Sequence, residues 1–69
     1  MGVGFLSLTE ADVFRRLESE YREMPGLMLT PQQAARLVAM PAWLVCLTLE
    51  RLVQTGFLRK SDLGTYLRA

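Results

Sequence analysis

Apolar and polar positions near the start of the chain alternate at helical spacing and predict a first helix over residues 9–24. The apolar positions on one face are Val13, Phe14, Leu17, Tyr21 and Met24. Thr9 suits the N-cap, because its hydroxyl can accept a hydrogen bond from a free backbone N–H group of the first turn. Pro25-Gly26 ends the helical pattern. Residues 1–8 precede this helix and are expected to form an N-terminal arm or an extra strand.

Residues 30–55 have the pattern of two helices joined by a short corner. Thr30 and Gln33 form a capping box, in which the two residues exchange side-chain-to-backbone hydrogen bonds at the start of a helix. Pro41 disfavours a helical conformation in the residue before it, so the second helix is expected to end near Ala39. Pro41 is then expected to open the third helix, as Pro31 opens the second. Gly56 suits a left-handed residue just past the end of the third helix.

Small residues mark the corner between these two helices. An alanine early in the second helix, a small residue at the corner and a branched apolar residue six positions later allow two helices to cross at a steep angle with little space between them. Ala35, Ala39 and Val45 occupy these places. Ala39 is therefore expected to pack against the facing helix with no space beyond its methyl group.

Residues 56–68 predict a β-hairpin. Phe57–Lys60 and Thr65–Arg68 are strand-like and are separated by a short polar link that ends in a glycine, which is typical of a hairpin. Leu27–Leu29 is apolar and too short for a helix, so it is expected to form a small strand that pairs with the hairpin.

The predicted elements add up to one domain over residues 1–69. The chain has 69 residues, of which 51% are hydrophobic, and a chain of this size forms one small core. The fold class expected is mainly α: a three-helix winged helix-turn-helix with a C-terminal β-hairpin wing.

The composition argues against several kinds of function. Cys46 is the only cysteine and the chain has no histidine, so no disulfide within the chain, no structural zinc site and no cofactor is expected. No nucleophile has a visible base and no glycine-rich phosphate loop is present, so the protein is not expected to be an enzyme. The longest uncharged run, Leu37–Leu49, is shorter than the roughly 20 residues of a spanning helix. A soluble cytoplasmic protein that does not enter the membrane is the expectation.

The stretch from Ala34-Ala35-Arg36-Leu37 to Gly64-Thr65-Tyr66 resembles the winged helix-turn-helix regulators of bacteria, of the MarR-like class, over more than half the chain. The resemblance implies a transcription regulator that binds double-stranded DNA, with the third helix in the major groove and the wing on phosphate or in the minor groove. By position, it assigns the DNA contacts to Gln32, Arg36, Ala42, Trp43, Arg51, Arg59, Lys60 and Arg68.

The charge distribution agrees with this division of the chain. Residues 1–23 hold five acidic side chains against three arginines, a net charge of −2. Residues 24–69 hold five basic side chains against two acidic ones, a net charge of +3. The positive half is therefore the half that contains the helix-turn-helix and the wing, although its charge is mild for a nucleic-acid-binding domain.

The third helix also suggests protein interaction as a second function, because apolar residues occupy most of its circumference. Nine of the twelve residues from Ala42 to Val53 are apolar, and such a helix must bury both faces. Its groove-facing positions hold no Arg, Lys, Asn or Gln to read guanine or adenine: Pro41, Ala42, Trp43, Cys46, Leu47 and Glu50.

One alternative to DNA binding is therefore a non-catalytic interaction or dimerisation module. Its interface would consist of Trp43, Leu44 and Leu47, docked on a second copy of the chain or on another protein. A further alternative is that the arm segment Val3–Leu6 covers Trp43 and Leu47 and completes the core.

Overall fold

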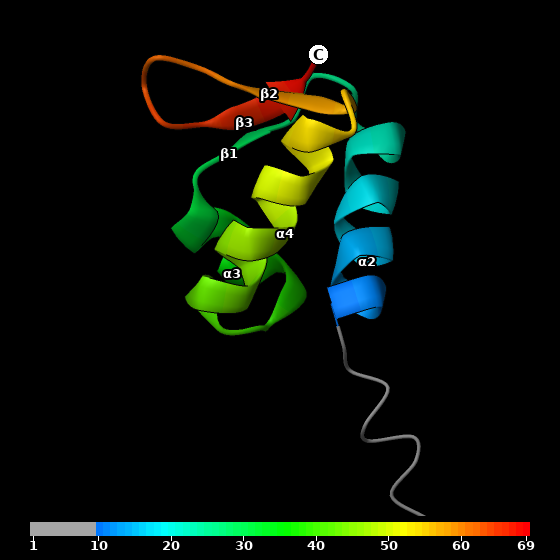
Figure 1. Cartoon of the computed structure of the whole chain (residues 1–69), viewed down its shortest axis with the longest axis vertical. Helices are drawn as coiled ribbons and strands as arrows, with labels where there is room; N and C mark the ends of the chain where they lie inside the picture. The colour runs from blue at the N-terminus through cyan, green and yellow to red at the C-terminus, as the bar shows by residue number, and fades with distance from the viewer. Residues whose placement is uncertain (1–9) are drawn as a thin grey trace, which may run out of the picture.

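The computed structural model describes residues 10–69, which form three helices and a three-stranded antiparallel sheet. Figure 1 shows the sheet at one end of the helices. Along the chain the elements are α2 (Glu10–Glu23), β1 (Met28–Leu29), α3 (Pro31–Val38), α4 (Ala42–Gln54), β2 (Leu58–Lys60) and β3 (Tyr66–Arg68). The predicted fold class, mainly α with three helices and a C-terminal hairpin, is confirmed. The predicted arm, 1–8, and the predicted N-cap Thr9 lie outside the described residues.

The start of α3 follows the predicted capping box. The Thr30 hydroxyl accepts a hydrogen bond from the Gln33 backbone N–H at 3.2 Å, and the Gln33 side-chain oxygen accepts one from the Thr30 backbone N–H at 2.9 Å. Pro31 is the first helical residue, where its missing N–H group would have had no helical partner. Local chemistry therefore determines where this helix begins.

The corner between α3 and α4 is sharp, and its packing differs from the prediction. The two helices are bent by 109°, within the range of about 90–120° typical of a helix-turn-helix. Ala39 caps α3 in the left-handed conformation, with φ 56° and ψ 45°, and it is exposed. The expectation that Ala39 packs against the facing helix is wrong, because the left-handed residue turns the chain and its methyl group faces solvent. The fully buried alanine is Ala34.

The sheet has the strand order β1-β3-β2, and both pairs are antiparallel. Met28 pairs with Leu67, which confirms the predicted small strand before α3. On the other side Lys60 pairs with Tyr66. Gly56, just after α4, has φ 85°, a left-handed conformation that suits glycine, as predicted.

The core lies between the helices and the inner face of the sheet. Its buried apolar residues are Val13, Leu17, Tyr21, Leu29, Ala34, Val38, Leu44, Val45, Leu49, Leu52, Leu58 and Tyr66. The Tyr21 hydroxyl donates a hydrogen bond of 2.6 Å to the backbone oxygen of Tyr66, 45 residues away. This contact ties α2 to β3, and burial raises the pKa of the Tyr21 hydroxyl to about 12.

Within residues 10–69, no single helix is long and apolar enough to cross a membrane. Only α3 and α4 counted together reach that length and composition, and they are bent by 109° at the break.

Candidate functional site

Helix α4 is buried on one side and exposed on the other. Its buried residues are Leu44, Val45, Thr48, Leu49 and Leu52. Its exposed residues, which we call the α4 face, are Ala42, Trp43, Cys46, Leu47, Glu50, Arg51 and Gln54. The Trp43 side chain is 69% exposed and Leu47 is 40% exposed. Within residues 10–69, most of the Trp43 surface is therefore open to solvent.

One predicted interface residue is not on this face. Leu44 is only 7% exposed and belongs to the core cluster, so its assignment to a protein interface is wrong. A helix that is apolar nearly all round gives no signal of which apolar residues point inward, and only the packing of α2 and α3 against α4 decides it.

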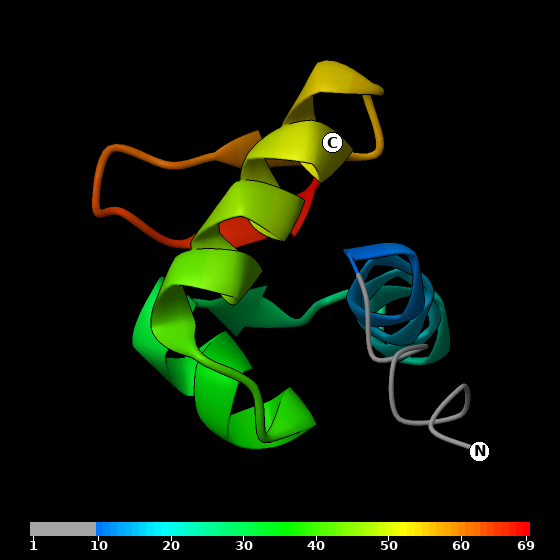
Figure 2. The same cartoon turned by 60° about the horizontal axis from the view of Figure 1, so that its bottom comes forward.

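The α4 face is bounded by the hairpin on one side and by α2 on the other. Glu50 accepts a hydrogen bond from the Tyr66 hydroxyl of β3. The next residue, Arg51, forms an ion pair of 3.3 Å with Glu10 of α2. Figure 2 shows α4 with the hairpin projecting to one side of it and α2 lying on the other. The two contacts therefore mark the two edges of the α4 face.

Tyr66 connects the hairpin to the α4 face. Its side chain is 1% exposed, and the Lys60 ammonium lies 5.6 Å from the centre of its ring. Burial, followed by the hydrogen bond and the negative charge of Glu50, raises the pKa of the Tyr66 hydroxyl well above its usual value of 10.0. The hydroxyl therefore stays protonated at neutral pH and acts as a hydrogen-bond donor to Glu50.

The basic residues of the hairpin differ in their surroundings. Arg59 and Lys60 are both exposed, and because successive residues of a strand point to opposite faces, they project from opposite faces of the sheet. Lys60 shares the inner face with Tyr66, next to α4, whereas Arg59 pairs with Leu67 on the outer face. Lys60 is therefore the hairpin cation on the same side as the α4 face.

Arg68 does not project freely from the hairpin. Its guanidinium lies 4.1 Å from the centre of the Phe57 ring, and its Nε atom is buried without a hydrogen-bond partner. Arg22 of α2 lies over the same ring at 5.3 Å. Arg68 therefore packs at the junction of the hairpin and α2, an arrangement that its position in the sequence does not indicate.

The predicted contacts on α3 are exposed. Gln32 and Arg36 lie one helical turn apart, Gln32 in the first turn and Arg36 in the last. A helix N-terminus carries free backbone N–H groups and a partial positive charge, which favours a nearby anion. Both side chains are exposed and are therefore open to an approaching partner.

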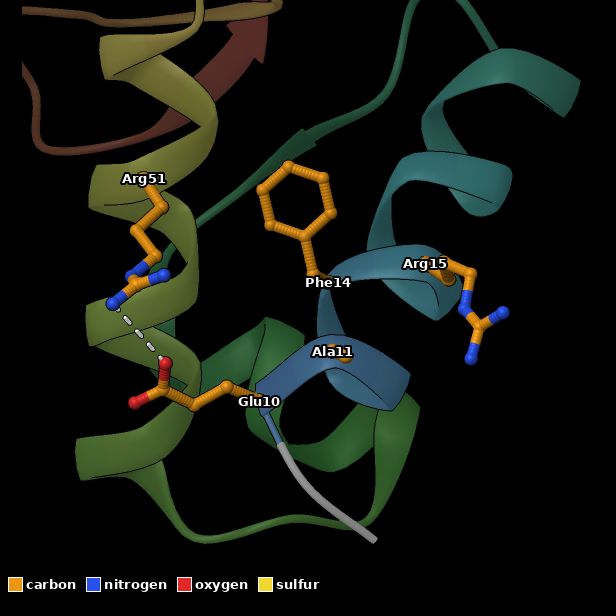
Figure 3. A pocket seen from close by; sticks show the side chains of 5 residues that line it. All are labelled: Glu10, Ala11, Phe14, Arg15 and Arg51. Carbon is orange, nitrogen blue, oxygen red and sulfur yellow. Dashed lines mark ion pairs between the residues drawn. The ribbon is translucent and has the colours of Figure 1, made fainter. Parts of the chain in front are cut away.

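A groove between α2 and α4, which the sequence did not indicate, has a volume of about 660 Å³. It is lined by Glu10, Ala11, Phe14, Arg15 and Arg51. Figure 3 shows the Phe14 ring between the two helices, the Glu10–Arg51 ion pair across the groove, and the Arg15 side chain turned away from α4. Arg51, a predicted DNA contact, is therefore already paired with an acidic side chain.

Within residues 10–69, no group of three or more His, Cys, Asp or Glu side chains is placed to hold a metal ion. The thiol of Cys46 is free and exposed on the α4 face.

Comparison with known proteins gave no match: no family model, no curated protein and no solved structure is similar to this chain.

Proposed function

We propose that the protein binds double-stranded DNA as a cytoplasmic transcription regulator, with the α4 face in the major groove and the hairpin on the neighbouring phosphates. The observation that carries the proposal is the junction at Tyr66. There, one buried tyrosine is bonded through its hydroxyl to Glu50 of the exposed α4 face and has the hairpin cation Lys60 over its ring. A helix fits the major groove, which is about 12 Å wide, and a cation beside the helix then faces the sugar-phosphate backbone.

The distribution of acidic residues supports this orientation. Of the seven acidic side chains in the sequence, five lie on α2: Glu10, Asp12, Glu18, Glu20 and Glu23. The turn of the hairpin projects on the side of α4 away from α2 (Figure 2), whereas the base of the hairpin contacts the C-terminal half of α2 through Tyr21. A duplex that meets the hairpin and the α4 face is therefore placed away from most of the negative charge, which lowers electrostatic repulsion.

The side chains of the α4 face determine which bases it can contact in the major groove. Ala42, Trp43 and Leu47 are exposed apolar groups that suit the methyl group of thymine. Few cations are available for phosphate contacts, so the affinity is expected to be modest and to fall with added salt.

The test is the salt dependence of binding to a short duplex. Because Trp43 is the only tryptophan and lies on the α4 face, its fluorescence reports the bound fraction without a label. Each phosphate contact contributes about 0.9 to the slope of log affinity against log salt. Lys60→Ala is therefore expected to flatten the slope by about 0.9.

Arg59→Ala is the matched control, because it removes the same charge from the opposite face of the hairpin. It is expected to change the slope less than Lys60→Ala does. Wild-type protein that binds no duplex at low salt would remove DNA as the partner. A larger effect of Arg59→Ala than of Lys60→Ala would show that the hairpin does not meet DNA through its inner face.

A second candidate function is self-association through the α4 face, and the exposure of Trp43 favours it. A tryptophan that is 69% exposed beside a leucine that is 40% exposed is typical of a protein interface, where buried aromatic anchors contribute most of the binding energy. In this candidate, two copies of the chain pack through Trp43 and Leu47, with no DNA involved.

Sedimentation of the wild type and of the variant with Trp43→Ala and Leu47→Ala distinguishes the two candidates. Self-association predicts a wild-type dimer and a folded monomeric variant, with circular dichroism as the control for folding. A wild type that stays monomeric at high concentration contradicts self-association, and a variant that unfolds places the two residues in the core.

A further inference from the structure

Glu50 is the only acidic residue on α4, and its side chain is held on the hairpin side of the α4 face. A carboxylate beside DNA is repelled by the phosphates, so an acidic side chain on a groove-facing helix requires a specific partner. The surroundings of Glu50 indicate what that partner is.

The first step concerns the free hydrogen-bonding capacity of the carboxylate. An ionised carboxylate only accepts hydrogen bonds, at about four lone-pair positions on its two oxygens. The Tyr66 hydroxyl donates to one oxygen, Oε2, so the other oxygen, Oε1, remains available. Glu50 itself is exposed, so a donor arriving from solvent can reach that oxygen.

The second step concerns the orientation of the side chain. The Tyr66 ring is 1% exposed, and the backbone oxygen of Tyr66 accepts the 2.6 Å hydrogen bond from Tyr21. The Tyr66 ring is therefore held in place by the core, and the Tyr66 backbone is held by Tyr21. The hydroxyl that Glu50 contacts has a fixed position as a result. A long side chain that is already oriented loses less conformational freedom when it binds a partner.

The third step concerns the charge around the pair. The Lys60 ammonium lies 5.6 Å from the centre of the Tyr66 ring, whose hydroxyl contacts Glu50, so a cation borders the same tyrosine as the carboxylate. This cation reduces the repulsion between Glu50 and the phosphates of a bound duplex. Glu50 can therefore enter the groove beside the hairpin.

Resting on the DNA-binding function proposed above, we propose that Glu50, positioned by Tyr66, reads a cytosine in the major groove. Cytosine presents only an amino donor on this edge, which matches an acceptor-only carboxylate. Adenine adds the N7 acceptor beside its amino group, guanine presents two acceptors, and thymine presents an acceptor and a methyl group, so neither guanine nor thymine offers a donor. The preferred site therefore contains a G·C pair at one fixed position next to the hairpin.

The experiment selects bound duplexes from a pool with a randomised central segment, and then measures Kd for the selected duplex with each base pair changed in turn. Wild-type protein is expected to prefer cytosine at one position by about tenfold or more. Glu50→Gln keeps an oxygen that can accept from Tyr66, but its amide suits adenine, so the preference at that position alone is expected to move to A·T.

Two further variants separate base reading from structural support. Tyr66→Phe keeps the buried ring and removes the donor, so it is expected to weaken the cytosine preference while binding to the pool is retained. Glu23→Gln removes an exposed charge on α2 and is expected to select the same sequences as the wild type.

The inference is overturned if wild type and Glu50→Gln bind DNA and select the same bases at every position, while DNA binding itself stands. If neither protein binds any duplex at low salt, the proposed function fails and the inference fails with it.

Discussion

Replacing Ala39 by glycine is expected to stabilise the protein, which is the opposite of the usual effect of glycine near a helix. Ala39 has φ 56° and ψ 45°, and a left-handed conformation costs a residue with a Cβ atom roughly 1–2 kcal/mol. Glycine removes this cost but loses roughly 0.5–1 kcal/mol through the greater freedom of the unfolded chain. Since the methyl group of Ala39 is exposed, its removal leaves no cavity. The net gain lies between about 0 and 1.5 kcal/mol, with a central value of about 0.7 kcal/mol.

Thermal and urea denaturation followed by circular dichroism measure this gain. For a domain of this size, 1 kcal/mol corresponds to a rise in Tm of roughly 4–8 °C. The matched control is Ala11→Gly, at an exposed alanine in the first turn of α2, where glycine is expected to cost up to about 1 kcal/mol, the value for a helix interior. The two substitutions should therefore shift Tm in opposite directions.

The reasoning fails if Ala39→Gly lowers Tm as Ala11→Gly does, because the corner would then not be left-handed. Ala39→Leu provides a second check. Because the side chain faces solvent, no overpacking is expected, whereas a buried position would lose about 1–3 kcal/mol.

Two further predictions concern the cap of α3 and the buried tyrosine. Thr30→Ala removes the acceptor for the Gln33 backbone N–H and is expected to lower the free energy of unfolding by about 1 kcal/mol. Urea denaturation measures this loss. Thr30→Ser keeps a hydroxyl acceptor and is expected to retain most of the stability of the wild type. For Tyr21, burial raises the folded-state pKa from 10.0 to about 12, so its contribution is fully present below pH 10 and is lost as pH rises toward 12. Stability measured over this range is expected to fall less in Tyr21→Phe than in the wild type, and an equal fall would contradict the assignment.

The elements of the fold were predictable because their signals are local. The capping box at Thr30 and Gln33, the corner before Pro41 and the left-handed glycine at Gly56 each depend on residues within one helical turn. The short strand at Met28–Leu29 was also predicted, from its length and its apolar character.

The candidate site was predicted only in part. Trp43 and Leu47 are exposed, as expected of the outward side of the third helix, but Leu44 is buried. Arg51 and Arg68 were assigned to DNA by position alone. In the structure Arg51 pairs with Glu10, and Arg68 packs over Phe57.

The sequence by itself determined that three helices and a hairpin form and in which segments, because caps, prolines and glycines act on the backbone next to them. The start of α4 differs from the prediction, since Pro41 is the N-cap and Ala42 is the first helical residue. Only the tertiary structure decided which side of α4 faces outward and what borders it. The contact between Glu50 and Tyr66 joins residues 16 apart, and that between Tyr21 and Tyr66 joins residues 45 apart. Such contacts depend on how α2, α4 and the sheet pack together, and the periodicity of a single helix carries no information about its neighbours.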